Sequence, residues 1–153
     1  MSSEIRARIS GLGFSMPQVA PTREFVRVAY LGNVAYVSGH APFDKGAFQY
    51  RGKVGQGVDL DTACRAAELS VLGCLASLEA ELGSLDRVAR IIKVNGYVNC
   101  APDFEELSHV TDVASRLLIA IFGESGRHAR TTVGVANLPF SVTVEMELVV
   151  LIK

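Results

Sequence analysis

The segment from His128 to Val150, HARTTVGVANLPFSVTVEMELVV, carries the residues best suited to chemistry. It combines Arg130 with Glu145 and Glu147. A guanidinium group pairs bidentately with a carboxylate ligand. A glutamate whose pKa is raised by partial burial can transfer protons or polarise a water molecule. The segment therefore favours a site for a small carboxylic acid, with Arg130 as its anchor and Glu145 as its acid–base group.

A β-hairpin would bring these charged residues together. A turn over residues 137–140 sets Thr132 opposite Glu145 and Arg130 opposite Glu147. Alternation then places Arg130, Thr132, Glu145 and Glu147 on one face of the sheet, and the apolar residues of both strands on the other. A simpler alternative is that Arg130 only pairs with Glu147 across the strands, a contact that contributes ~0.2–1 kcal/mol.

The first half of the chain predicts two strands and then a helix. Two β-rich runs, residues 24–30 and 34–40, flank a short turn, and a glycine-rich loop follows over residues 44–57. Residues 1–22 predict no regular element, because glycines and prolines interrupt them. Apolar residues then recur every three or four positions, which indicates an amphipathic helix.

The ends of that first helix are marked by capping residues. Asp59 or Asp61 can accept hydrogen bonds from its first backbone N–H groups, and Gly83 supplies a left-handed end. The run RVARIIKVNGYVN, residues 87–99, predicts the next strand.

A second amphipathic helix is predicted between Asp103 and Gly123. Asp103 can cap its start, with Glu106 in the capping-box position. The predicted order is therefore β-β-α-β-α-β-β, an α+β fold with a mixed sheet and both helices on one face. Because that leaves the other face uncovered, we expect a symmetric homo-oligomer in which Arg130 and Glu145 line a cleft.

Composition sets the class of protein. The chain has 153 residues, 49% hydrophobic and 20% charged, which fits one domain over residues 1–153. A net charge of −1 gives no basic footprint for nucleic acid. No apolar run is long enough for a membrane span or a signal peptide, so we expect a cytoplasmic protein. Three cysteines in no metal-ligand spacing predict neither a metal site nor a disulfide framework, and no cofactor is expected.

Three segments together resemble the RidA/YjgF family of enamine and imine deaminases, whose members are also labelled L-PSP endoribonucleases. They are GNVAYVSGHAPFD at 32–44, GSLDRVARIIKVNGYVNCAPDF at 83–104 and ARTTVGVANLPFSVTVEME at 129–147. The segments RGKVGQGVDL and FGESGRHAR are most similar to its chorismate-mutase-like subgroup of endoribonucleases. The resemblance implies a fold like the trimeric type of chorismate mutase and a homotrimer with pockets between subunits.

The resemblance also assigns roles to particular residues. Arg130 matches the arginine that holds the substrate carboxylate, and Glu145 matches the glutamate that positions the attacking water. Gly39, in the SG turn, lies beside the family's pocket, and His40 follows it where glutamine is common. The remaining two substrate-binding positions also depart from the family: Phe25 replaces a tyrosine and Thr132 replaces a cysteine.

The expected reaction is hydrolysis of a 2-imino or 2-enamino acid to ammonia and a 2-oxo acid. Two other classes stay open. One is a non-catalytic trimer that binds a small carboxylic acid metabolite, which fits the missing tyrosine and cysteine. The other is an endoribonuclease, which the family label names but which a chain without a basic stripe or aromatic platform supports poorly.

Overall fold

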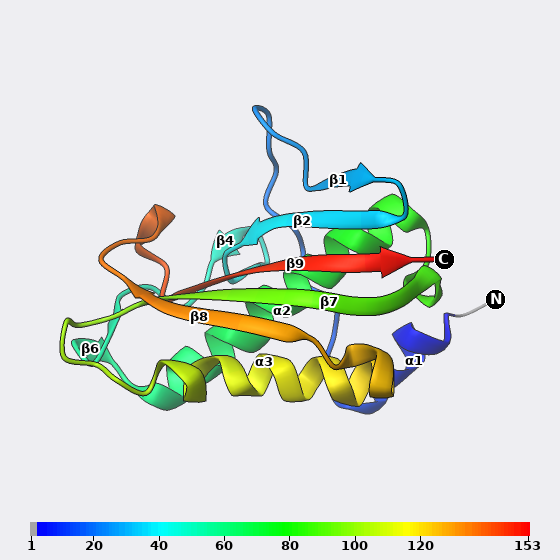
Figure 1. The fold of residues 1–153 in the computed structure, drawn as a ribbon. Helices are drawn as coiled ribbons and strands as arrows, with labels where there is room; N and C mark the ends of the chain where they lie inside the picture. The colour runs from blue at the N-terminus through cyan, green and yellow to red at the C-terminus, as the bar shows by residue number, and fades with distance from the viewer. Residues whose placement is uncertain (1–2) are drawn as a thin grey trace.

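Five strands form a mixed sheet in the order β1-β2-β9-β7-β8 (Figure 1). The computed structural model describes residues 3–153. The strands of the sheet are β1 Val28–Leu31, β2 Val34–His40, β7 Val88–Asn99, β8 Ala129–Val135 and β9 Val144–Ile152. β7 and β8 run parallel, and the other neighbouring pairs run antiparallel.

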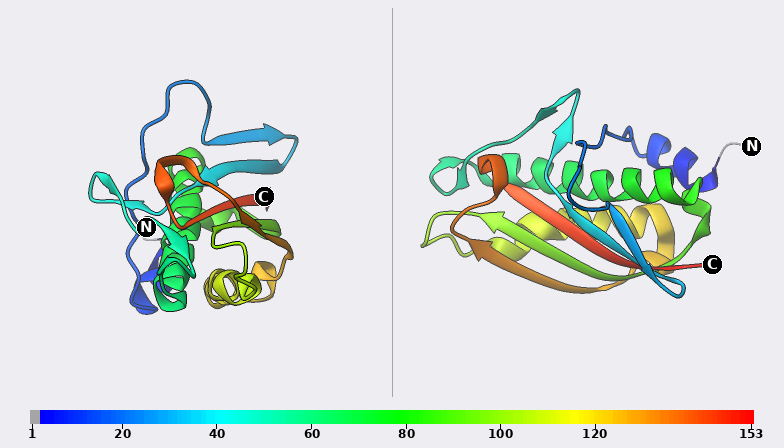
Figure 2. Two further views of the ribbon diagram at one scale, coloured as in Figure 1. Left: turned by 90° about the vertical axis from the view of Figure 1, so that its left-hand side faces the viewer. Right: turned by 90° about the horizontal axis from the view of Figure 1, so that it is seen from above.

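Two long helices, α2 Leu60–Leu82 and α3 Leu107–Phe122, cover one side of this sheet (Figure 2). The prediction of an α+β fold with a mixed sheet and its two main helices on one face is confirmed. Between β2 and α2 the glycine-rich loop forms two small two-stranded ladders. They comprise β3 Phe43–Asp44, β4 Ala47–Phe48, β5 Lys53–Val54 and β6 Gly57–Val58.

The predicted ends of α2 are confirmed. Asp59 is the N-cap, and its Oδ1 accepts a hydrogen bond of 2.8 Å from the Thr62 backbone N–H. At the other end Gly83 adopts φ 78°, and its N–H bonds to the Glu79 carbonyl.

The predicted start of α3 is wrong. Its N-cap is Glu106, which makes no side-chain capping bond, and Asp103 lies in the preceding loop. Phe104 N–H instead bonds to the Ala101 carbonyl in a tight turn, so the chain enters the helix three residues later than a cap at Asp103 would require. Gly123 closes the helix as predicted.

A helix at the N-terminus, α1 Glu4–Gly11, corrects the prediction that residues 1–22 are irregular. Ser3 caps it, and Asp86 accepts hydrogen bonds from the Ser3 hydroxyl and from the N–H groups of Glu4 and Ile5. Asp86 lies far along the chain in the 3-10 turn η1 Leu85–Arg87. A tertiary contact therefore anchors the start of this short helix, and no local sequence period shows it.

The predicted terminal hairpin is also wrong, because β7 lies between β8 and β9. Arg130 stands beside Val94 of β7, and Val94 stands beside Leu148 of β9. Glu145 lies three positions along the ladder, beside Tyr97. Consequently Thr132 does not face Glu145, and Arg130 faces neither Glu147 nor Glu145.

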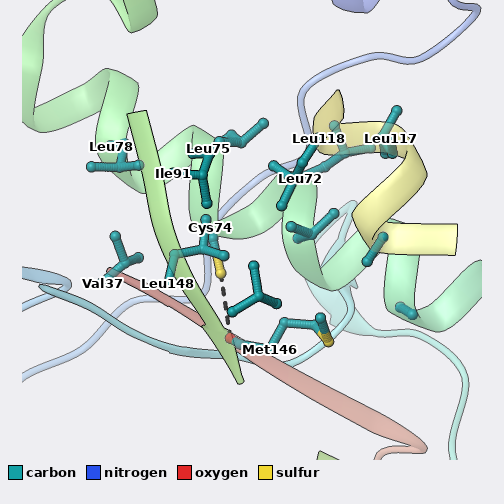
Figure 3. Close-up of a cluster of buried hydrophobic side chains, with 14 of the residues drawn as sticks. Val37, Leu72, Cys74, Leu75, Leu78, Ile91, Leu117, Leu118, Met146 and Leu148 are labelled. Atoms are coloured by element: carbon teal, nitrogen blue, oxygen red, sulfur yellow. Dashed lines mark hydrogen bonds between the residues drawn. The ribbon is translucent and has the colours of Figure 1, made fainter. Parts of the chain in front are cut away.

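The hydrophobic core fills the space between the sheet and the helices (Figure 3). Alternate residues of β9 point into it, as the sequence predicts, and Met146, Leu148 and Val150 are almost completely buried. Cys74 of α2 is buried among them and donates a 3.3 Å hydrogen bond from its Sγ to the Met146 carbonyl. Burial raises the pKa of the Cys74 thiol, so this cysteine is a packed core residue.

The opposite side of the sheet, here called the open face, carries no helix. Glu145, Glu147 and their neighbours Asn95 and Tyr97 on β7 lie there. Glu147 Oε1 accepts hydrogen bonds of 2.7 Å from Asn95 Nδ2 and 2.9 Å from the Tyr97 hydroxyl. Glu147 is therefore held within its own sheet.

Candidate functional site

A cavity of about 500 Å³ lies where β2 ends and β9 begins, in the size range of small-molecule sites. Its walls come from segments far apart in the sequence: residues 18–25 and 39–41, helix α2, and the 3-10 turn η3 Pro139–Ser141. In Figure 1 the end of β2, the start of β9 and this turn lie at the left-hand end of the sheet. Four predicted site residues meet here: Phe25, Gly39, His40 and Glu145.

Glu145 is a partly buried carboxyl on the wall of the cavity. Gly39 is packed against its carboxylate, and a Cβ at that position would overlap Glu145 Oε1. Burial, followed by the charge of Glu147, raises the pKa of Glu145, and the positive charge of Arg27 opposes that rise. A carboxyl with a raised pKa both accepts and returns a proton near neutral pH more readily than an ordinary one.

His40 lines the cavity as a neutral ring. Its Nδ1 lies 2.6 Å from the Ser38 carbonyl and its Nε2 lies 2.7 Å from the Ser77 hydroxyl. Because a carbonyl only accepts, Nδ1 carries the proton and Nε2 accepts from Ser77. Burial lowers the pKa of His40 to about 4. Both ring nitrogens are thus hydrogen-bonded within the protein, and His40 contributes an uncharged surface to the cavity wall.

Arg27 is a cavity residue that the sequence alone does not single out. Its guanidinium lies 5.4 Å from the centre of the Phe25 ring and donates to the Ala20 carbonyl. Its charge also acts on the pKa of Glu145 and of His40. The alternation in VRVAY did place Arg27 and Val28 on opposite faces, but only the fold shows that Arg27 lies beside Glu145.

A wall of three phenylalanines was missed as well. Phe48 stacks on Phe140 with ring centres 4.1 Å apart, and Phe43 meets Phe48 edge to face at 5.2 Å. Phe140 has φ 58°, in the left-handed region that bulky residues rarely adopt. The Arg51 Nε and the Gly52 N–H bond to the carbonyls of Phe140 and Ser141 and hold this turn.

Arg130 and Thr132 lie outside this cavity. Both point toward α3 from the edge strand β8: Arg130 pairs with Asp112 at 2.8 Å and donates to the Ser115 hydroxyl at 3.0 Å. The Thr132 hydroxyl lies 2.7 Å from that of Thr111. Glu145 is on the open face, so Arg130 and Glu145 of one copy lie on opposite faces of the sheet.

Two further features of the described residues bear on function. Among residues 3–153, no three His, Cys, Asp or Glu side chains lie together as metal ligands would. None of the helices within that range is long and apolar enough to cross a membrane.

Residues 6–151 match the family model described as "YjgF/chorismate_mutase-like, putative endoribonuclease". The chain belongs to this family. Protein TCP17 of Trypanosoma cruzi is 37% identical over 97% of this chain and 94% of its own length. The family model and this relative thus each match almost the whole chain.

Solved structures agree with this family assignment. The protein Atu1372 from Agrobacterium tumefaciens is 41% identical, with a TM-score of 0.91 over 97% of this chain and 93% of its own. A "putative endoribonuclease" from Shewanella oneidensis MR-1 is 27% identical, with a TM-score of 0.93 over 97% and 99% of the two chains. The resemblance to the YjgF family and to its chorismate-mutase-like fold is therefore confirmed.

Proposed function

We propose that this YjgF-family protein is a small-molecule hydrolase that acts on 2-imino and 2-enamino acids. The observation that supports it best is the half-buried Glu145 carboxyl with its raised pKa, at the wall of a cavity of suitable size. An enamine first becomes the imine by gaining a proton at its carbon and losing one from its nitrogen. Water then adds across the C=N bond, and the adduct loses ammonia as its hydroxyl proton passes to the nitrogen, which leaves the 2-oxo acid.

Glu145 has two tasks in this reaction. As a carboxylate it accepts a proton from the attacking water, and as a carboxylic acid it returns that proton to the departing nitrogen. General acid–base help of this kind contributes ~10²–10⁴-fold. Such imines also hydrolyse unaided, so a site that positions water and supplies one proton carrier is sufficient.

The carboxylate of the substrate requires a cation, and Arg130 and Arg27 are two candidates; Arg23 also lines the cavity but is exposed. Arg130, assigned this role from the sequence, can join Glu145 only from a second copy, and in its own copy Asp112 neutralises it. The proposal includes a homotrimer that covers the open face, with either Arg130 of a second copy or Arg27 of the same copy as the cation. Arg27 already shares the cavity with Glu145.

The test is an imine-hydrolysis assay with a matched glutamate control. An amino-acid oxidase generates 2-iminopropanoate in solution, and its disappearance is followed with wild type, Glu145→Gln and Glu24→Gln. Glu24 lines the same cavity but is exposed. We expect Glu145→Gln to lose the acceleration and Glu24→Gln to keep it. No acceleration by the wild type would overturn the proposal, and carboxylate binding without turnover would favour the non-catalytic binder.

A further inference from the structure

Arg27 carries a positive charge that no ion pair of the described residues neutralises. Its Nε is buried and has no hydrogen-bond partner, while one Nη donates to the Ala20 carbonyl. Burial lowers the pKa of Arg27. Placing an uncompensated guanidinium in a partly buried position costs free energy that a bound anion would offset.

The same side chain is placed to meet a ligand that also reaches Glu145. The two residues line one cavity, and each influences the pKa of the other, yet no pair of their charged atoms lies within 4.0 Å. A 2-imino acid has its carboxylate bonded directly to the imine carbon. A carboxylate on Arg27 would therefore bring that carbon toward the Glu145 side of the cavity.

One side of the cavity wall is aromatic. Phe43, Phe48 and Phe140 form a connected set of rings, and Phe140 is 60% exposed despite its size. Two consecutive residues, Phe140 and Ser141, hold left-handed backbone angles of φ 58° and 57°. Such strain persists only where the surroundings impose it, and it is common at ligand-binding sites. Here it holds the Phe140 ring against Phe48 in the cavity wall.

We propose that Arg27 binds the substrate carboxylate and that the wall of Phe43, Phe48 and Phe140 receives an aromatic or large apolar side chain. The substrate class is then a 2-imino acid related to phenylpyruvate. Arg130 stays in its ion pair with Asp112. Hydrolysis of this imino acid rests on the proposed function, but binding of an aryl carboxylic acid does not, so binding and hydrolysis are tested separately.

Calorimetric titration of 3-phenylpropanoate tests the binding. Its neutral analogue 3-phenylpropanamide and the ringless propanoate separate the contributions of charge and ring. We expect wild type to bind the acid at least about tenfold more tightly than either, since a charge-assisted bidentate contact and a buried ring are each worth more than ~1.4 kcal/mol.

The variants then assign the charge contact. Arg27→Gln should raise the Kd for 3-phenylpropanoate at least about tenfold and leave the amide unchanged, and Arg27→Lys, which keeps stem and charge, should recover part of the affinity. Arg23→Gln, at an exposed arginine of the same cavity, and Arg130→Gln should bind like wild type. Wild-type affinity in folded Arg27→Gln, or weakened binding in Arg130→Gln, would overturn the proposal.

The ring contact and the reaction have their own readouts. Phe140→Ala should raise the Kd for 3-phenylpropanoate and leave the Kd for propanoate unchanged. Equal effects on the two Kd values would refute the aromatic wall. If wild type binds the aryl acid through Arg27 but hydrolyses no imine, the proposed function fails and this inference holds. If Arg27→Gln hydrolyses the phenylpyruvate imine with an unchanged KM, the proposed function holds and this inference fails.

Discussion

Gly39 and Glu145 are packed so closely that a side chain at position 39 would occupy the space of the Glu145 carboxylate. The absent Cβ is therefore what allows Glu145 to face the cavity. The neighbouring atoms belong to the end of a flexible side chain, so a larger residue at position 39 would displace the carboxylate rather than the backbone.

Gly39→Ala should therefore impair the reaction more than the fold. We expect imine hydrolysis to fall by up to about 100-fold, because small misplacements of a catalytic group have effects of that order. The free energy of unfolding should change by less than about 1.5 kcal/mol, because the flexible side chain can move aside. Gly11→Ala is the control, because a Cβ there meets nothing within 4 Å. Full activity in Gly39→Ala would contradict the role of Glu145.

His40 makes stability depend on pH. Its pKa of about 4 lies below the ordinary value of 6.5, so the unfolded chain binds more protons between these limits. The contribution of His40 to the free energy of unfolding is therefore complete above pH 6.5 and is lost as the pH falls toward 4. Between pH 7.5 and 4.5, wild type should lose about 2–3 kcal/mol more unfolding free energy than His40→Gln, by denaturant titration. His109→Gln, at an exposed histidine, should follow wild type instead.

Glu147 should tune the pH profile of the reaction without touching the substrate. Its negative charge raises the pKa of Glu145, second only to burial. In Glu147→Gln the pKa of Glu145 should fall, so the base form persists to lower pH. The acid limb of kcat/KM against pH should then shift to lower pH. A profile that does not move would mean that another group carries the proton.

The open face should be a contact between copies. Tyr36, 48% exposed on β2, and Val133, 39% exposed on β8, present apolar surface there, with Val149 of β9 between their strands. Tyr36→Glu should convert a trimer to monomers in sedimentation velocity, because a charge would be buried in the contact. Leu12→Glu, at an exposed leucine just after α1, should leave the assembly intact. A monomeric wild type would exclude Arg130 from the site.

Local sequence was sufficient to predict the two long helices, the order of the five strands of the sheet along the chain, and the family. Asp59 and Gly83 mark the ends of α2 because capping depends on groups within one turn of the helix. The alternation in β9 identifies its buried face because one side of that central strand is wholly apolar. The cluster of Gly39, His40 and Glu145 follows from family positions, which the fold brings together.

Only the tertiary structure decided how the last two strands relate. Two strands that pair as a hairpin and two strands separated by β7 have the same local sequence pattern, because strand pairing depends on residues far apart in the chain. β8 is an edge strand with small or polar residues on both faces, so alternation did not reveal that Arg130 turns toward α3 and Asp112. For the same reason Arg27, one charge just before β1, became a site residue only once the fold had placed it in the same cavity as Glu145.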